Sequence, residues 1–474
     1  MINRTLCSFV SVAAFCCLFF YCSYPKFIEP DPLQAPVKTL QKQEQKLDLE
    51  IREEAAVNSA SEIDFADAFV NDSAEAADSE NENQTLQSFI YPPFFISNNR
   101  VRVALLRNIT QITFYSVSKL GISSLNDYSF KGRIVFRIRG QQVWMTTENK
   151  NHIITLPCTL KSKSEYNYID IGDKSYRGDI ILTMEKNGRF SVINSLPVEE
   201  YLRGVVPLEI GKRPESEAEA LKAQAVAART YTYKRIKERK NHFFDLTCTV
   251  SDQVYGGVHV EYRESDLAIK STENLIMVYD DSLVHAYYHS TCGGKTANIE
   301  DVWDKQPYNY LRSVRDTDST GNAYCRISRY FTWKEKWSKW DFNTIVFRHL
   351  KNSFPQNNIG GKITVFKIES QFADGRVNMC TFGGPGWTQK TGGDKIRFIL
   401  RRNISDNAIL RSANFKITAL KDVISVEGRG YGHGVGMCQM GAIGRARAGQ
   451  EFEQILKSYY TGISINKATI TKRK

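Results

Sequence analysis

The chain has 474 residues, with 63 Lys or Arg, 52 Asp or Glu, 42% hydrophobic residues and 12% aromatic residues. This composition supplies a sizeable packed core and excludes a wholly disordered chain. Ten cysteines are too few for a disulfide-dense miniprotein, and 30 glycines with 13 prolines show no collagen-like bias. A globular body of one large or two ordinary domains remains.

The charge is divided unevenly along the chain. Residues 27–90 hold fifteen acidic residues and only four basic ones, which gives this stretch a net charge of −11. Residues 91–474 therefore carry a net charge of +20. A body this basic favours a negatively charged polymer or surface as its partner.

Residues 1–26 have the pattern of an export segment, in which Arg4 precedes an apolar run from Leu6 to Tyr24. A membrane span needs about 20 residues, and no small-residue cleavage pattern follows this run. We expect an uncleaved signal anchor, with a cleaved signal peptide as the alternative. The body is then exported and membrane-anchored, in the periplasm or the cell-wall space.

The stretch that follows is predicted to be an acidic disordered linker over residues 27–95. It is rich in Glu, Asp, Gln, Ala and Ser and almost free of aromatic residues as far as residue 88, so it cannot bury enough surface to offset chain entropy. Export also removes nucleic acid as the natural partner of the basic body. Another anionic polymer is expected instead.

The body is predicted to be α+β: mixed and β-rich, with a helical lobe and a substrate cleft. Residues 96–195 form its β-rich N-terminal part, because apolar residues alternate with polar ones between Gly, Asn and Asp turns. Residues 343–427 again mix helix and strand. The expected N-terminal strands begin at Val101, Ile134, Val143, Ile153 and Ile180.

Two helices follow the strands. The first is short, from Leu196 to Gly204, with Pro near its start and Gly at its end. The second is predicted to begin at a capping box formed by Ser216 and Glu219 and to run to about Arg239. Within it, Lys222 and Arg229 are two helical turns apart, so both side chains are expected to point the same way.

Glu209 is a single carboxylate among apolar residues between these helices. Apolar surroundings raise the pKa of a carboxyl group, and a general acid that works near neutral pH needs such a shift. Charged residues are mostly exposed, so a solvated loop residue is the alternative interpretation.

Two later segments are rich in glycine. The first, Tyr287–Thr296, holds Cys292 three residues after His289; side chains at this spacing in an extended stretch face opposite ways, so we do not predict a thiol nucleophile. The second, Gly428–Ala442, has six glycines in fifteen residues, more than plain packing requires. There we expect His433 to contact substrate, with a structural histidine as the alternative.

Four segments, in this order, resemble the stage II sporulation protein D and amidase-enhancer family: Leu196–Glu209, Ala220–Tyr231, Ser290–Gly294 and Gly430–Ala442. The resemblance extends over about residues 98–465. It implies a catalytic core of this type over residues 196–465, followed by a basic tail over residues 466–474.

The resemblance implies a lytic transglycosylase that cleaves peptidoglycan glycan strands, preferably those stripped of stem peptides, to 1,6-anhydro-muramic acid ends during division or sporulation. Glu209 is the implied catalytic residue, and no cofactor is implied. Partners would be the glycan strands and a cell-wall amidase, with the membrane held by the N-terminal segment. The implied substrate-binding residues of the cleft are Lys222, Arg229, Ser290, Thr291 and His433.

Some members of this family bind zinc through two His and two Cys residues. Here His242 and Cys248 match two of the ligands, but Ser251 and Asp252 stand where a His-Cys pair is expected. Ser is a poor zinc ligand and structural zinc sites use four good ones, so we predict no metal. The six cysteines of the body allow fifteen disulfide pairings, and their spacing selects none of them.

Two other functions remain open from the sequence. The protein could be a non-catalytic wall-binding module that enhances an N-acetylmuramoyl-L-alanine amidase, as the second name of the family suggests. It could also be an exported scaffold, in which Glu209 would face solvent far from His433. The sequence does not distinguish division from sporulation and gives no oligomeric state.

Overall fold

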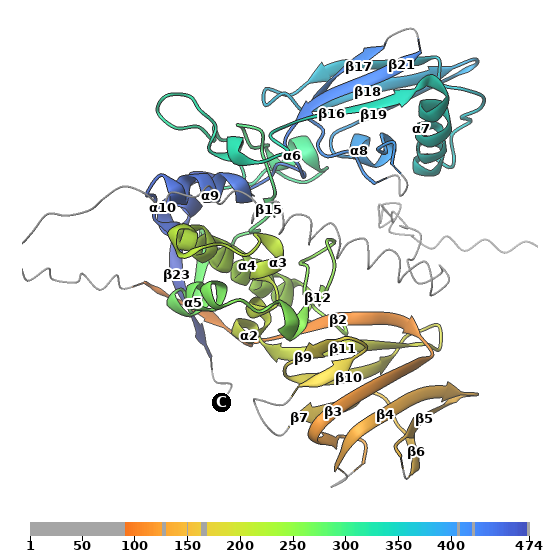
Figure 1. Cartoon of the computed structure of the whole chain (residues 1–474), viewed down its shortest axis with the longest axis vertical. Helices are drawn as coiled ribbons and strands as arrows, with labels where there is room; N and C mark the ends of the chain where they lie inside the picture. The colour runs from red at the N-terminus through yellow and green to blue at the C-terminus, as the bar shows by residue number, and fades with distance from the viewer. Residues whose placement is uncertain are drawn as a thin grey trace, which may run out of the picture. The chain divides into compact units, whose positions relative to one another are not determined.

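The computed structural model describes residues 91–125, 129–148, 150–162, 168–404, 408–419 and 422–471 (Figure 1). The predicted membrane segment and residues 27–90 of the predicted linker lie outside these ranges. None of the helices within the described ranges is both long enough and apolar enough to span a bilayer. The described part is a mixture of helices and strands with a β-rich N-terminal portion, as predicted.

The N-terminal portion forms an 11-stranded sheet with the strand order β12-β2-β11-β10-β7-β3-β4-β5-β6, in which β8 pairs with β3 and β9 with β8. Its strands are β2 (Arg100–Ile109), β3 (Gln111–Ile122), β4 (Ser129–Arg139), β5 (Gln142–Thr146), β6 (Asn151–Ile154), β7 (Cys158–Ser162), β8 (Ile169–Ile171), β9 (Lys174–Tyr176), β10 (Asp179–Met184), β11 (Phe190–Pro197) and β12 (Leu246–Thr247).

These strands form because their apolar residues repeat with a period of two, which places them on one face. In β4, Phe130, Ile134 and Phe136 are buried while their neighbours are more exposed. Phe136 meets Phe114 of β3 edge to face, with ring centroids 5.8 Å apart. The strands predicted near Val101, Ile134, Val143, Ile153 and Ile180 are all present.

A smaller sheet joins the two ends of the described chain, in the order β1-β23-β13-β14. Its strands are β1 (Pro93–Ile96), β13 (Leu275–Tyr279), β14 (Ser282–Leu283) and β23 (Ser464–Ile470). Two predicted boundaries therefore move. Residues 93–95 belong to a strand rather than to the linker, and the first part of the basic tail is also a strand.

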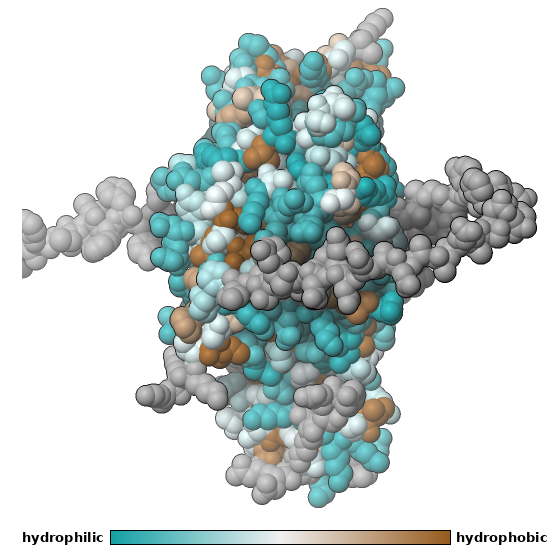
Figure 2. Space-filling view, turned by 90° about the vertical axis from the view of Figure 1, so that its left-hand side faces the viewer, coloured by the Kyte–Doolittle hydropathy of each residue, from teal (hydrophilic) through white to brown (hydrophobic). Residues whose placement is uncertain are grey.

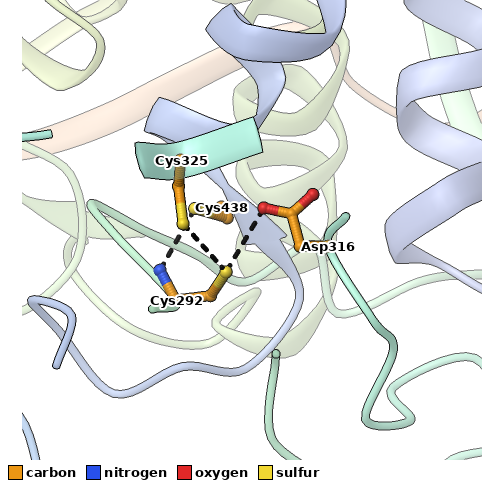
Figure 3. Close-up of side chains that lie close together, drawn as sticks. All are labelled: Cys292, Asp316, Cys325 and Cys438. Carbon is orange, nitrogen blue, oxygen red and sulfur yellow. Dashed lines mark hydrogen bonds between the residues drawn. The ribbon is translucent and has the colours of Figure 1, made fainter. Parts of the chain in front are cut away.

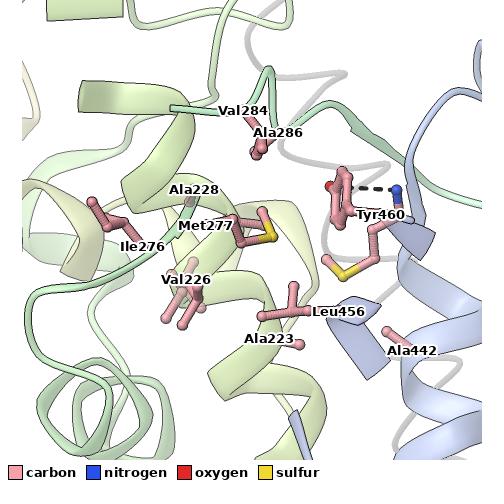
Figure 4. Packing of buried hydrophobic residues seen from close by; sticks show 14 of the residues in the cluster. Ala223, Val226, Ala228, Ile276, Met277, Val284, Ala286, Ala442, Leu456 and Tyr460 are labelled. Carbon is pink, nitrogen blue, oxygen red and sulfur yellow. Dashed lines mark hydrogen bonds between the residues drawn. The ribbon is translucent and has the colours of Figure 1, made fainter. Parts of the chain in front are cut away.

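Helices surround a second core, to which this small sheet also contributes. Residues of α4 such as Ala223 and Val226 pack there with Met277 of β13 and with Leu456 and Ala442 from the C-terminal helices (Figure 4). Small residues on α4 permit this close approach. The helical elements are α2 (Val198–Arg203), α3 (Val206–Glu209), η2 (Glu215–Glu217), α4 (Ala218–Glu238), η3 (Gly257–Val260), α5 (Arg263–Ser271), α6 (Ile299–Val302), η4 (Tyr324–Ile327), α9 (Gln439–Arg447) and α10 (Phe452–Tyr459).

The long helix is present, but its predicted capping box is not. A short 3-10 turn precedes α4, and the residue at its N-cap position, Glu217, makes no capping side-chain hydrogen bond. Glu219 instead accepts a hydrogen bond from the backbone N–H of Phe452 at 2.8 Å, at the start of α10. A tertiary contact thus replaces the local one that the sequence favours.

A third region, between η4 and α9, has its own hydrophobic core around Trp337 and Phe342. It contains two three-stranded sheets, β16-β21-β20 and β17-β18-β19, with two helices, which agrees with the predicted mixture. The elements are β16 (Thr332–Ser338), α7 (Lys339–Ser353), β17 (Val365–Gln371), β18 (Val377–Gly384), β19 (Trp387–Gly392), α8 (Lys395–Ile399), β20 (Phe415–Ala419) and β21 (Val423–Arg429).

The surface drawn in Figure 2 is mostly hydrophilic, with hydrophobic residues in small patches. The most exposed large hydrophobic side chains among the described residues are Val250 (83%) in the loop after β12, Trp340 (74%) in α7 and Val117 (73%) in β3. The face in this view therefore shows no extended apolar patch.

Candidate active site

Glu209 is the last residue of α3, a single helical turn that follows α2. Pro207 lies in the first turn, where its missing N–H costs no helical hydrogen bond. The neighbouring Ile210 is buried in the helical core and holds the turn in place. Glu209 itself is half-buried, and its Oε1 accepts a hydrogen bond from the Val254 backbone N–H at 2.8 Å.

Tyr288 belongs to β15 (Tyr288–His289) and hydrogen-bonds to Glu209 through its side chain. Gln253 donates from Nε2 to the Tyr288 hydroxyl oxygen at 3.0 Å, which leaves the hydroxyl hydrogen for the Glu209 carboxyl. The Oε1 of Gln253 accepts a hydrogen bond from the Thr232 hydroxyl at 3.0 Å. This chain of buried polar groups orients the donor that faces Glu209.

Burial raises the pKa of Glu209 to about 7, because removal from water disfavours the charged carboxylate. Hydrogen bonds from the Val254 N–H and from the side chains of Tyr288 and Gln439 act in the opposite direction, since they stabilise the carboxylate. The group is therefore partly protonated near neutral pH and has donors in place for its ionised form. A residue that both gives and takes a proton needs this balance.

Lys222 lies in the first half of α4 and is half-buried. Its Nζ lies 2.6 Å from Glu219 Oε1, an ion pair within one helical turn. Because both side chains are more than a quarter exposed, water screens this pair and an incoming anion can compete with Glu219. A role for Lys222 in substrate binding stays a prediction.

Arg229 has a different environment, and its predicted contact with substrate stays a prediction. Its side chain is fully buried, and its Nε and Nη2 each lie 2.7 Å from the Glu199 carboxylate of α2. Its remaining donors bind the carbonyls of Leu275 and Ile269. Helices α2 and α5 cover this half of α4, so Arg229 joins elements of the core.

The Ser290–Thr291 turn is joined to the glycine-rich loop by backbone pairing. Thr291 and Tyr431 exchange two backbone hydrogen bonds, at 2.9 and 2.8 Å. Thr291 is 1% exposed and its hydroxyl lies 2.8 Å from that of Ser328, and its predicted contact with substrate stays a prediction. Ser290 is half-buried, and its predicted substrate contact stays a prediction.

The glycine-rich loop owes its composition to backbone geometry. Gly430, Gly432, Gly434 and Gly436 all have positive φ, between 71° and 106°, a region that other residues rarely adopt. A Cβ at Gly436 would come within 2.0 Å of the Tyr287 carbonyl oxygen. The glycine density therefore has a structural explanation, contrary to the prediction that it exceeds what packing requires.

His433 is half-buried in this loop, with both ring nitrogens hydrogen-bonded. Its Nδ1 accepts from the Val435 backbone N–H at 3.1 Å, so its Nε2 carries the hydrogen that is donated to the Tyr288 carbonyl at 3.0 Å. Burial lowers the pKa of His433 to about 4, which makes the ring neutral at physiological pH. It holds the loop to β15, and its predicted contact with substrate stays a prediction.

Tyr288 separates Glu209 from His433. Successive side chains of a strand face opposite ways, so Tyr288 turns toward Glu209 while its neighbours Tyr287 and His289 pack near the His433 ring. The predicted site residues thus do not line one face of a single cleft. Glu209 and His433 are nevertheless linked through Tyr288, whose side chain bonds to Glu209 and whose carbonyl accepts from His433. The scaffold interpretation required Glu209 to lie far from His433, so this link disagrees with it.

Sequence analysis missed a group of aromatic rings beside His433. The Trp303 ring lies 4.8 Å from the His433 ring and 5.0 Å from the Tyr287 ring. Lys305 Nζ donates to the Tyr287 hydroxyl at 2.8 Å and lies 5.0 Å from the ring centroid. The two adjacent tyrosines at positions 287 and 288, one residue before the Ser-Thr turn, were the available signal, although nothing in the sequence places Trp303 next to them.

A separate groove lies in the third region and has a volume of about 620 Å³. Residues of β16, β20 and β21 line it, among them Lys334, Lys416 and Arg429. None of the predicted site residues is part of its lining. The catalytic interpretation therefore depends on the contacts of Glu209, not on this groove.

The six described cysteines form no disulfide. Three of them, Cys292, Cys325 and Cys438, converge with Asp316 in one buried cluster (Figure 3). Within the described ranges this is the group of potential metal ligands that comes together, and neither His242 nor Cys248 is part of it. No pattern in the sequence indicates that these four residues meet.

Comparison with known proteins defines the class. Residues 186–279, which include Glu209, Lys222 and Arg229, match the family model described as "Stage II sporulation protein". Stage II sporulation protein D of Bacillus subtilis is 29% identical over 292 residues, which cover 58% of this chain and 76% of the relative. The predicted resemblance to the stage II sporulation protein D and amidase-enhancer family is thus confirmed by the family model and by relatives with both names.

Two further relatives show how far the similarity extends. An uncharacterised protein of Brachyspira hyodysenteriae is 28% identical over 385 residues, which cover 78% of this chain and 94% of that protein. "Amidase enhancer" of Bacillus subtilis is 29% identical over 301 residues, 56% of this chain but only 40% of the relative. The similarity to the amidase enhancer is thus confined to less than half of that protein.

Proposed function

We propose that this protein is a lytic transglycosylase that cleaves the glycan strands of peptidoglycan, with Glu209 as its catalytic acid and base. The observation that carries the proposal is a half-buried carboxyl group with a pKa raised to about 7 and with hydrogen-bond donors directed at it. Similarity to the stage II sporulation protein D family supports the choice of substrate.

A lytic mechanism needs one such carboxyl group, whereas ordinary glycosidases use two. Protonated Glu209 donates its proton to the glycosidic oxygen as the bond to the anomeric carbon breaks. The resulting carboxylate, held by Val254 and Tyr288, then takes the proton from the 6-hydroxyl of muramic acid. That oxygen attacks the anomeric carbon, which yields a 1,6-anhydro end and returns Glu209 to its protonated form without water.

The charge of the body supports an acidic glycan as the substrate. Residues 91–474 carry a net charge of +20, and a strand stripped of its peptides presents a lactyl carboxylate on every muramic acid. Lys222 near the start of α4 and Lys305 beside the rings of Tyr287 and Trp303 are the cations we assign to these carboxylates. Aromatic rings beside a lysine suit a sugar that carries an acid.

The proposal includes an exported location, because peptidoglycan lies outside the cytoplasm. The apolar run of residues 1–26 would anchor the chain, and the acidic residues that follow would hold the basic body away from the membrane. Cell-wall remodelling during division or sporulation is the corresponding process.

A second candidate function is favoured by one specific observation, the similarity to a relative named "Amidase enhancer". In that case the basic body binds the wall and stimulates a cell-wall amidase without breaking glycosidic bonds itself. Glu209 would then have no chemical role, and its raised pKa would only cost stability at neutral pH.

Product analysis separates the two functions. The full-length chain is incubated with peptide-stripped glycan strands in isotopically labelled water, and the new ends are identified by mass spectrometry. A lytic enzyme leaves unlabelled anhydro ends, and Glu209→Gln abolishes them while Glu215→Gln, a change at an exposed neighbour, does not. The proposal would be rejected by labelled reducing ends, or by anhydro ends that persist in the Glu209→Gln variant. The absence of any cleavage would favour the amidase-enhancer function.

A further inference from the structure

Four side chains from separate parts of the chain meet in one buried cluster: Cys292, Asp316, Cys325 and Cys438 (Figure 3). Their sulfur and carboxylate oxygen atoms all lie within 4.8 Å of one another. The Sγ atoms of Cys292 and Cys325 are 3.5 Å apart, and Cys292 Sγ is 3.3 Å from Asp316 Oδ2. All four residues are fully buried.

We propose that this cluster is a structural zinc site with three sulfur ligands and one oxygen ligand. Zinc–sulfur and zinc–oxygen bonds of about 2.3 and about 2.0 Å in a tetrahedron set sulfur–sulfur and sulfur–oxygen separations of about 3.8 and about 3.5 Å. The observed separations of 3.5 and 3.3 Å are within a few tenths of an ångström of these values. The other ligand atoms lie within 4.8 Å of one another and would move closer together when the metal binds.

Asp316 is oriented as a metal ligand should be. Its Oδ1 accepts hydrogen bonds from the Tyr459 hydroxyl at 2.7 Å and from Arg445 Nε at 3.1 Å. Its Oδ2 therefore points at the sulfur atoms. Carboxylates that bind metals are commonly held through their second oxygen in this way, and Arg445 also offsets part of the negative charge.

The sulfur atoms have the donors that thiolates require. Cys438 Sγ accepts the backbone N–H groups of Cys292 at 3.1 Å and of Gly441 at 3.2 Å, and Cys292 Sγ accepts that of Gly294 at 3.3 Å. Cys438 is also the N-cap of the nine-residue helix α9, whose dipole favours a negative charge there. A Cβ at Gly441 would come within 2.2 Å of Asp316 Oδ2, so only glycine leaves room for the cluster.

The choice of zinc follows from the ligands and from burial. Three sulfurs and one oxygen in a small tetrahedron suit zinc, whereas copper(I) prefers sulfur alone and calcium or magnesium prefer oxygen. Four protein ligands leave no open position for substrate, which is typical of a structural and not a catalytic site. These ligands differ from the His242 and Cys248 pair considered from the sequence, where no metal is predicted.

The site would hold together the segments that support Glu209. Cys292 closes the Ser290–Thr291 turn, and Cys438 precedes Gln439, which hydrogen-bonds to Glu209. Both loops carry the glycines with positive φ. A metal at their junction would fix them without touching the substrate, so this inference stands whether or not the protein cleaves glycan.

Metal analysis of the full-length chain, purified without chelator and without added metal, tests the proposal. We expect about one zinc per chain, and X-ray absorption at the zinc edge should show three sulfur neighbours and one oxygen neighbour. The double change Cys292→Ala with Cys325→Ala should remove the zinc. Cys380→Ser, at a buried cysteine of the third region, should keep it.

Three outcomes would overturn the proposal. Wild-type protein that contains no metal, with the three thiols free or two of them joined in a disulfide by peptide mapping, has no zinc site here. Zinc retained after the double change belongs elsewhere in the chain. An absorption spectrum with fewer than three sulfur neighbours excludes these ligands even if the double variant fails to fold.

Discussion

Two carboxyl groups, Glu209 and Asp316, lie beside the same hydrophobic core and have different partners. Asp316 is 0% exposed and is held by Arg445 and Tyr459 on one oxygen and by Cys292 on the other. Glu209 is half-buried and receives only neutral donors, none of which is an arginine or a lysine. Burial with a cation stabilises structure, whereas burial with neutral donors leaves a carboxyl group able to exchange a proton.

The largest expected effect comes from removing the proton of Glu209. Glu209→Gln should lower kcat on peptide-stripped glycan on the order of a thousandfold, which is the usual contribution of general acid–base catalysis. Glu215→Gln on the exposed turn before α4 serves as the control and should leave kcat unchanged. Full activity in the Glu209→Gln variant would show that the difference between the two carboxyl groups has no catalytic meaning.

The second effect tests Asp316. Arg445→Met removes the arginine that pairs with this buried carboxylate, so the free energy of unfolding should fall by about 3 kcal/mol in urea titrations. Lys457→Met removes an exposed ion pair with Glu453 on α10. This change should alter the free energy of unfolding by less than about 0.5 kcal/mol. Equal losses in both variants would contradict the assignment of Asp316 to a structural role.

The third effect is a dependence of stability on pH. A carboxyl group with a folded pKa of about 7 and an unfolded pKa near 4.5 loses stability as pH rises through this interval, because the unfolded chain ionises first. Glu209→Gln should therefore be more stable than wild type at pH 8 by about 1–2 kcal/mol, after allowance for partial exposure, and should lose this advantage at pH 4. Thermal unfolding at the two pH values measures the difference.

The smallest effect concerns the donor that faces Glu209. Tyr288→Phe removes a hydrogen bond that stabilises the carboxylate, so the pKa of Glu209 should rise and the basic limb of the kcat/KM profile should move to higher pH. The rate should fall about tenfold, the worth of one hydrogen bond to a charged group. If the rate falls but the basic limb of the kcat/KM profile stays at the same pH, Tyr288 has only a structural role and does not set the pKa of Glu209.

Much of the fold was predictable because its signals are local. The strands of residues 100–197 follow from alternation, and α4 follows from a long run of helix-forming residues. The capping box predicted for α4 was wrong because Glu219 bonds to Phe452, more than two hundred residues away. The strands at residues 93–96 and 464–470 were missed for the same reason. β1 and β23 pair with each other, and neither pairing partner can be recognised from the local sequence.

The site was predictable in part. Glu209 was found because an isolated carboxylate among apolar residues is visible in the sequence. The burial of Arg229 could not be predicted, because it depends on how α2 and α5 pack over one half of α4. The cysteine cluster was invisible for a similar reason, as its members are spread over residues 292–438 and only the folded chain brings them together.

The pairing of β1 with β23 has a consequence for how the molecule is made. The last strand, β23, lies between β1 and β13, so the first described strand has no neighbour in this sheet until synthesis has passed residue 470. Such long-range pairing is slow to form. This sheet therefore closes only after residue 470 has been made, and a product that lacks residues 464–470 would leave the edges of β1 and β13 bare and prone to self-association.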